Sequence, residues 1–177
     1  YADIGGAGST IAAQMAVELG FSVRGSDQNL YPPTSTELKA SGIPYTEGYA
    51  EQNLEYGPDL VVLGNAISRG NVELEYALAQ RFEILSLPQF VAEYVIGRRR
   101  SLVIAGTHGK TTTTSLAAHV LREAAIDTGY MIGGVAADFP RSAAVGSADL
   151  FVIEGDEYDT SIFDQRSKFL SYRPTHV

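Results

Sequence analysis

The stretch Leu102-Val103-Ile104-Ala105-Gly106-Thr107-His108-Gly109-Lys110-Thr111 decides the fold of its part of the chain. Four apolar residues predict a buried strand, the glycines predict a tight turn, and the segment after Lys110 has helical periodicity. A strand, a glycine-containing turn and a helix in this order are typical of a phosphate-binding loop. Backbone N–H groups in such a loop surround phosphate oxygens at the positive end of the helix.

The side chains of this loop suit a nucleoside triphosphate. Lys110 supplies a positive charge for the β- and γ-phosphates, and the hydroxyl of Thr111 can hold Mg²⁺. The strict pattern G-x-x-x-x-G-K-[ST] would place glycine at position 104, where this chain has Ile104, so the loop is a shortened variant. A glycine-rich turn without a ligand is the alternative. The expected nucleotide-binding residues are Gly106, Thr107, His108, Gly109, Lys110, Thr111 and Thr112.

Composition narrows the classes of function. Hydrophobic residues make up 45% of the chain and the formal net charge is −8, which describes an acidic globular protein and argues against nucleic acid as a partner. No apolar run is long enough to cross a bilayer, so membrane insertion is not expected. The absence of cysteine excludes disulfides, thiolate metal sites and a cysteine nucleophile. Nothing at the start resembles a signal peptide, and a cytoplasmic location is expected.

Short apolar runs alternate with helix-period segments along the chain. This alternation predicts an α/β fold with mainly parallel sheets. Gly97-Arg98-Arg99-Arg100 interrupts the pattern, so we expect a Rossmann-like domain over residues 1–97 and the start of a P-loop α/β domain over residues 98–177. Residues 173–177 look like the beginning of a further strand. We therefore expect the chain to be a piece of a longer protein.

Apolar periodicity predicts the buried faces of two helices. The first helix follows the glycines at 5–8, buries Ile11, Met15 and Leu19, and ends at Gly20. The second follows Lys110, with His119 pointing away from the buried stripe. That stripe is expected to comprise Leu116, Ala117, Val120, Leu121 and Ala124.

The glycine loop at residues 5–8 has a weaker pattern. Asp27 follows Gly8 by about 20 residues, as an acidic residue does in dinucleotide sites, but Asp3 stands where the first glycine of G-x-G-x-x-G belongs. The loop supports an anion or diphosphate site at a helix N-terminus, with a structural turn as the alternative. A nicotinamide-dependent oxidoreductase would account for this loop but not for Lys110 and Thr111.

An acidic cluster, Glu154 to Asp159, follows the apolar run at residues 149–153. A carboxylate at the end of a buried strand is well placed to hold a nucleotide-bound Mg²⁺ near Thr111. An acidic surface turn is the alternative. The following Arg166-Ser167-Lys168 run could bind a substrate carboxylate or phosphate, or could consist of ordinary exposed cations.

Three motifs together resemble the Mur ligases of bacterial cell-wall synthesis: G-T-H-G-K-T-T-T-T at 106–114, G-G-A-G at 5–8 and E-G-D-E-Y-D at 154–159. The resemblance covers essentially the whole chain. Segments 25–33, 64–71 and 158–169 are most similar to the branch that joins UDP-N-acetylmuramate to the tripeptide L-alanyl-γ-D-glutamyl-meso-diaminopimelate in peptidoglycan recycling. The branch that adds L-alanine to UDP-N-acetylmuramate is the alternative, and a non-catalytic nucleotide-binding regulator is a more remote one.

The resemblance implies an ATP- and Mg²⁺-dependent ligase that forms an amide bond through an acyl phosphate. It implies catalytic roles for Lys110 and Glu154, with Thr111 and Glu154 as the metal-binding residues. The family's later metal-binding histidine and its C-terminal domain would lie beyond Val177, so this chain is not expected to complete the reaction alone.

The resemblance also implies where the two organic substrates bind. Contacts to the UDP end are expected from Gly6, Ala7, Gly8, Ser26, Asp27, Asn65, Ala66, Ser68 and Arg69. Contacts to the peptide or muramoyl side are expected from Tyr158, Asp159, Arg166 and Lys168.

Overall fold

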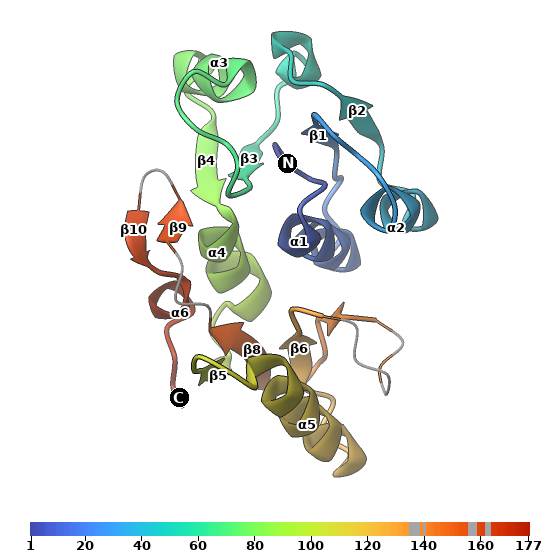
Figure 1. The fold of residues 1–177 in the computed structure, drawn as a ribbon, viewed down its shortest axis with the longest axis vertical. Helices are drawn as coiled ribbons and strands as arrows, with labels where there is room; N and C mark the ends of the chain where they lie inside the picture. The colour runs from blue at the N-terminus through green and yellow to red at the C-terminus, as the bar shows by residue number, and fades with distance from the viewer. Residues whose placement is uncertain (135–138, 140, 156–158, 162–163) are drawn as a thin grey trace. The chain divides into compact units, whose positions relative to one another are not determined.

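The computed structural model describes residues 1–134, 139, 141–155, 159–161 and 164–177 (Figure 1). It divides into two compact units, Tyr1–Phe90 with Thr160–Gln165, and Val91–Asp159 with Arg166–Val177. Both units combine helices with parallel strands, which confirms the predicted α/β class. The division falls within a helical segment made of α4 (Leu87–Phe90) and the π-helix η2 (Val91–Ile96), ahead of Gly97.

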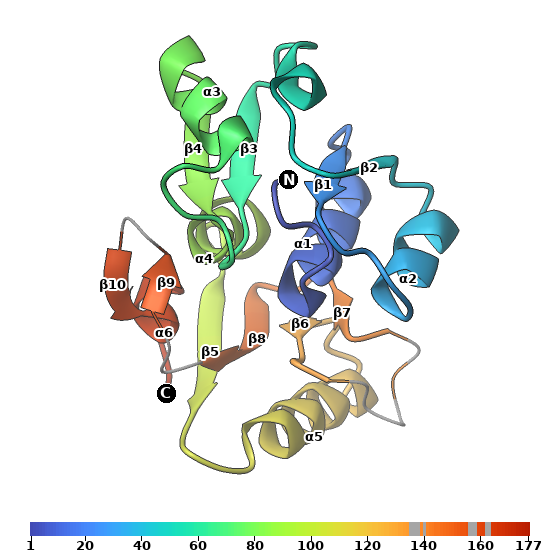
Figure 2. The same ribbon diagram turned by 45° about the horizontal axis from the view of Figure 1, so that its top comes forward.

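The strands of the first unit are short and parallel. They are β1 (Gly25–Asp27), β2 (Tyr45–Glu47), β3 (Leu60–Leu63) and β4 (Glu83–Ser86), with β1 paired to β2 and β3 to β4. Ala2 forms parallel bridges to Ser26 and to Leu63, so the start of the chain lies between β1 and β3 (Figure 2). The carboxyl ends of β1 and β3 therefore flank the first glycine loop.

The helices of the first unit are α1 (Ala7–Glu18), α2 (Thr34–Ala40), η1 (Glu51–Leu54), α3 (Val72–Gln80) and α4. Ile11 and Met15 are buried in α1 as predicted. Leu19 is 37% exposed, contrary to the prediction, because α1 ends at Glu18 and Leu19 is its C-cap. Gly20 follows with a φ of +93°.

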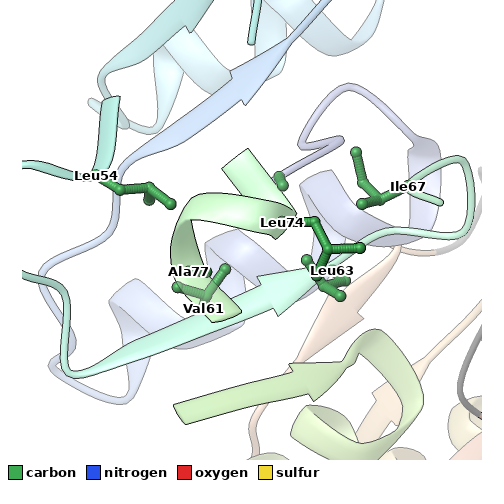
Figure 3. Close-up of a cluster of buried hydrophobic side chains, with 7 residues drawn as sticks. Leu54, Val61, Leu63, Ile67, Leu74 and Ala77 are labelled. Carbon is green, nitrogen blue, oxygen red and sulfur yellow. The ribbon is translucent and has the colours of Figure 1, made fainter. Parts of the chain in front are cut away.

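One part of the core of this unit lies between α3 and β3 (Figure 3). The Asn71 side chain caps α3 by accepting the N–H groups of Glu73 and Leu74. This start directs Leu74 and Ala77 inward onto the strand. The cluster comprises Ala2, Leu54, Val61, Leu63, Ile67, Leu74 and Ala77.

The second unit contains a sheet in the order β5-β8-β6-β7. Its strands are β5 (Arg100–Ala105), β6 (Gly129–Met131), β7 (Ala143–Ala144) and β8 (Leu150–Gly155). The β5–β8 and β6–β8 pairs are parallel, and β6–β7 is antiparallel. His176 forms a parallel bridge to Leu102 of β5, in agreement with the strand expected near residues 173–177. Helix α6 (Lys168–Ser171) also belongs to this unit, whereas the paired strands β9 (Asp159–Ser161) and β10 (Asp164–Ser167) are divided, with Thr160–Gln165 in the first unit.

Helix α5 (Lys110–Glu123) corrects one prediction. Leu116 and Val120 are 60% and 56% exposed, whereas Thr114 and Ala118 are fully buried. Two overlapping apolar stripes run along this helix, and the smaller residues allow it to approach the sheet closely. Ala117 and Leu121 are partly buried beside that face, Ala124 is exposed, and His119 is exposed as predicted. Within the described residues, no helix is both long and apolar enough to span a membrane.

Candidate functional site

Asp27, at the end of β1, holds the first glycine loop in place through a hydrogen bond to its backbone. Its Oδ2 accepts the Gly5 N–H at 2.8 Å, and its Oδ1 accepts the Asn29 N–H at 3.0 Å. The side chain is buried. The structure therefore brings the predicted acidic residue to the predicted loop, where it binds the protein's own backbone.

Asp3 lies at the centre of the loops expected to bind the UDP end. Its φ is +67°, in the left-handed region that favours glycine, and its Oδ2 accepts the Ala66 N–H at 3.2 Å. A Cβ at Gly64 would lie 2.3 Å from the same carboxylate oxygen, so a larger residue there would force Asp3 or the turn to move. Asp3 thus joins the glycine loop to the turn after β3.

The electrostatic environment of Asp3 is unfavourable for its charge. Burial raises the pKa of Asp3 to about 6, and the negative charge of Asp27 and a hydrogen bond to Asp27 add to this rise. The Ala66 N–H acts in the opposite direction. The first candidate site therefore contains a carboxyl group, that of Asp3, whose charged form is disfavoured.

The Ser26 hydroxyl donates a hydrogen bond to a buried carboxylate, that of Glu73. Glu73 is 1% exposed and accepts hydrogen bonds from Ser26 Oγ, Asn53 Nδ2 (2.6 Å) and the Ala50 N–H (3.3 Å). These bonds join α3, β1 and the segment around η1. Sequence analysis missed Glu73, because an acidic residue in the first turn of a helix is ordinarily exposed and dipole-stabilised.

The other residues predicted for the UDP end divide into two groups. Gly6 is the N-cap of α1, and Ala7 and Gly8 form its first turn, so their position suits an anion at the helix N-terminus. Asn65, Ser68 and Arg69 are exposed. The Arg69 guanidinium is engaged by Glu75, with Nε–Oε1 at 2.8 Å and Nη2–Oε2 at 3.1 Å. Their proposed ligand contacts stay predictions.

The second glycine loop joins β5 to α5. Gly109 is the N-cap of α5 and has a φ of +78°, which glycine adopts without steric cost. No side chain caps this helix start, so its amide groups are available for an anion. Lys110 Nζ donates to the Gly106 carbonyl at 2.7 Å. Thr107, His108 and Thr112 are exposed, and His108 Nδ1 lies 3.3 Å from Thr107 Oγ1.

Glu154 reaches this loop from the neighbouring strand. The β5–β8 register sets Glu154 opposite Ile104, near the carboxyl end of β5. Glu154 Oε2 accepts the Thr111 hydroxyl at 3.3 Å, and Oε1 accepts the Gly133 N–H at 2.9 Å. The two residues predicted to hold Mg²⁺ are therefore in contact. Sequence analysis missed Gly133, whose role depends on the placement of β6 beside β8.

The donor set at Thr111 and Glu154 fits Mg²⁺ in a nucleotide site. Mg²⁺ prefers oxygen ligands and commonly takes one or two carboxylates together with substrate phosphates and waters. Among the residues that the structure describes, no group of three or more His, Cys, Asp or Glu side chains could hold a metal by itself. Asp156 and Glu157 of the predicted acidic cluster lie outside the described residues.

For the residues predicted to contact the peptide or muramoyl side, the structure gives at most the backbone element to which each belongs. Tyr158 lies outside the described residues. By backbone, Asp159 belongs to β9, Arg166 to β10 and Lys168 to the start of α6. Their roles stay predictions.

Comparison with known proteins identifies the family. The model of the Mur ligase family, catalytic domain, matches residues 2–99, more than half of the chain. The chain belongs to the Mur ligase family. This finding confirms the predicted membership of the family.

Individual Mur ligases are similar over most of the chain. The UDP-N-acetylmuramate–L-alanyl-γ-D-glutamyl-meso-2,6-diaminoheptandioate ligase of Escherichia coli is 47% identical over 92% of this chain and 35% of its own length. The UDP-N-acetylmuramate–L-alanine ligase of Renibacterium salmoninarum is 38% identical over 98% of this chain and 35% of its own length. A murein peptide ligase structure from Psychrobacter arcticus is 43% identical, with a TM-score of 0.90 over 98% of this chain and 40% of that one. The chain thus spans about a third of the curated relatives it matches.

Proposed function

We propose that the chain is the N-terminal part of a ligase that joins UDP-N-acetylmuramate to L-alanyl-γ-D-glutamyl-meso-diaminopimelate with ATP and Mg²⁺, in peptidoglycan recycling. The branch is supported by 47% identity to a relative named for this tripeptide, against 38% to one named for L-alanine. The contact between Thr111 and Glu154 beside Lys110 carries the nucleotide chemistry.

The two units would bind different ligands. Residues 1–97, as a Rossmann-like domain, would hold the UDP end at the carboxyl ends of β1 and β3, because parallel sheets bind ligands at that edge. Residues 98–177, as the start of a P-loop domain, would hold ATP. Tyr158, Asp159, Arg166 and Lys168 would face the peptide or muramoyl side.

The reaction proposed from family membership has two steps. The muramoyl carboxylate attacks the γ-phosphorus of ATP, which forms an acyl phosphate and releases ADP. The amine of the tripeptide then attacks the acyl carbon, the amide bond forms, and phosphate leaves as the amine loses a proton. Phosphoryl transfer of this kind depends mainly on positioning and on charge stabilisation.

Residues of the second glycine loop would supply that stabilisation. Lys110 would exchange the Gly106 carbonyl for phosphate oxygens and balance their charge. The Thr111 hydroxyl and the Glu154 carboxylate would hold Mg²⁺, which neutralises phosphate charge when bound. The Gly133 N–H would keep the Glu154 carboxylate in place.

Phosphate release by the intact protein tests this function. With UDP-N-acetylmuramate, ATP and Mg²⁺ present, the tripeptide should give a far higher kcat/KM than L-alanine. An equal or greater preference for L-alanine would assign the protein to the alanine-adding branch. Binding of ATP without acceptor-dependent ADP release would favour the nucleotide-binding regulator.

A further inference from the structure

Asp3 occupies a backbone position suited to glycine and fills the space that glycine would leave open. Its φ of +67° is accessible to glycine and, among other residues, chiefly to aspartate and asparagine. Its carboxylate lies over the Cα of Gly64 and accepts the N–H of Ala66. The side chain therefore adds a negative group between two loops.

The place that this carboxylate occupies suits an anion. The Ala66 N–H points into it, and the N-terminus of α1, capped only by Gly6, begins at the same loop. Helix N-termini and convergent N–H groups favour negative charge. Asp3 satisfies one of these donors with a charge that belongs to the protein.

We propose that Asp3 is a specificity-determining residue whose carboxylate competes with the diphosphate of the UDP-linked substrate for the site between the first glycine loop and Ala66. The inference rests on the proposed function, since it takes a diphosphate as the ligand. Ionised Asp3 repels that ligand and occupies the Ala66 N–H. Binding is therefore accompanied by protonation of Asp3 or by its displacement, and affinity rises as pH falls.

The charged and titratable groups around Asp3 reinforce this dependence. Asp27 at the end of β1 interacts with it directly. Tyr49, after β2, has its pKa raised by burial and by the charges of Asp27, Asp3 and Glu73, so these acidic groups share one neighbourhood. The turn after β3 contributes the Ala66 N–H, while Arg69 from that turn is paired with Glu75. A diphosphate entering here therefore meets the carboxylates of Asp3 and Asp27.

Burial and Asp27 raise the pKa of Asp3 to about 6, which places the change of affinity between pH 5 and pH 8. A diphosphate diester keeps a constant charge over this interval, and so does the muramoyl carboxylate. The pH dependence of binding therefore reports protein groups. Uridine carries no phosphate and gives the matched uncharged ligand.

The test is isothermal titration calorimetry of the intact protein with UDP-N-acetylmuramate and with uridine at pH 5 and pH 8. Wild-type affinity for UDP-N-acetylmuramate should fall at least about tenfold from pH 5 to pH 8, because juxtaposed like charges weaken binding. Asp3→Asn removes the charge and keeps the left-handed backbone. It should bind at least about tenfold more tightly than wild type at pH 8 and equally at pH 5.

Asp3→Gly and Asp59→Asn complete the series. Asp3→Gly also frees the Ala66 N–H, so it should bind at least as tightly as Asp3→Asn. Asp59 is exposed before β3, and Asp59→Asn should retain the wild-type pH dependence. Uridine affinity should be the same in all variants.

Several results would overturn the role of Asp3: equal affinities of Asp3→Asn and wild type at pH 8, an unchanged pH dependence in Asp3→Asn, or a parallel change in uridine affinity. In the first two cases wild-type binding of UDP-N-acetylmuramate would leave the proposed function intact. If wild type and both Asp3 variants failed to bind UDP-N-acetylmuramate at either pH, the UDP site itself would be refuted and Asp3 with it.

Discussion

The two glycine loops occupy similar places in the fold but carry side chains of opposite charge, with carboxylates at the first and a lysine at the second. Each follows a strand position in a parallel sheet and leads into a helix that no side chain caps. The first follows Asp3 and is held by Asp27, so carboxylates accept hydrogen bonds from the Gly5 N–H of the loop and from the Ala66 N–H of the adjoining turn. The second contains Lys110, whose ammonium contacts the loop's own Gly106 carbonyl.

The glycine pattern thus sets the backbone of each loop, while the charged groups around it decide which ligand is stabilised. In the second loop the carboxylate of Glu154 contacts the Thr111 hydroxyl and the Gly133 N–H rather than the loop amides. That arrangement suits a metal beside a phosphate. In the first loop the carboxylates stand where an anion would bind.

Lys110→Ala should have the largest effect of the changes considered, and it should distinguish the function of the second glycine loop from that of the first. In the intact protein ligase turnover should fall at least about 100-fold, because the transferred phosphoryl group loses its nearest protein cation. UDP-N-acetylmuramate binding should be unchanged. Phosphate release and calorimetry measure the two quantities. As a control, Lys39→Ala on α2 removes an equivalent charge in the other unit and should leave turnover and UDP-N-acetylmuramate binding unchanged. Wild-type turnover in Lys110→Ala would contradict the role of Lys110.

Glu154→Gln should test the role of the carboxylate beside the second glycine loop, because it removes the charged group proposed to hold Mg²⁺. The Mg²⁺ concentration for half-maximal turnover should rise at least about tenfold, because a charged oxygen ligand becomes a neutral amide of the same size. A Mg²⁺ titration of turnover at saturating ATP measures this. An unchanged requirement would remove Glu154 from the metal site.

Gly64→Ala should disrupt the first loop through packing. Its Cβ would lie 2.3 Å from Asp3 Oδ2 and 2.7 Å from Asp3 Cβ, so the loops must separate. We expect a loss of about 1–3 kcal/mol in the free energy of unfolding, measured by urea denaturation followed by circular dichroism. Gly134→Ala is the control, since its Cβ would meet the nearest atom, Thr111 Cγ2, at 3.5 Å, an ordinary contact. Equal free energies of unfolding for the two variants would show that the Asp3 side chain can move aside without loss of stability.

Asp3→Asn should have the smallest effect on stability, with a defined sign. Since the folded-state pKa of Asp3 is raised from 3.8 to about 6, its contribution is most favourable below pH 4 and is lost as pH rises through 6. At pH 7 the variant should be more stable than wild type by about 1 kcal/mol, after allowance for solvent screening of a partly exposed group. The difference should shrink towards pH 4. Denaturation at both pH values measures it, and a pH-independent difference would refute this titration.

Contiguous patterns were the part of the molecule that sequence could predict. The strand, turn and helix around Gly106–Thr111 are present, and so are the buried residues Ile11 and Met15 of α1. The expectation that Glu154 would lie near Thr111 also agrees with the structure. These features depend on local periodicity and on the rule that parallel strands share a carboxyl edge.

Side-chain partners across the fold were not accessible in the same way. The pairing of Asp27 with Gly5, the contact of Asp3 with Ala66 and the burial of Glu73 each join residues 20 or more positions apart. The buried face of α5 likewise depends on which of two apolar stripes meets the sheet.

The α/β class, the two glycine loops and the family could be predicted from the amino-acid sequence, because each is encoded in short runs of residues. The partners of the charged groups became known only from the folded chain: Asp27 binds a loop amide, Asp3 accepts the Ala66 N–H, and Glu154 contacts Thr111 and Gly133. A side chain's protonation and partners depend on the strands and turns beside it. Strand register sets those neighbours, and it joins segments that are distant along the chain.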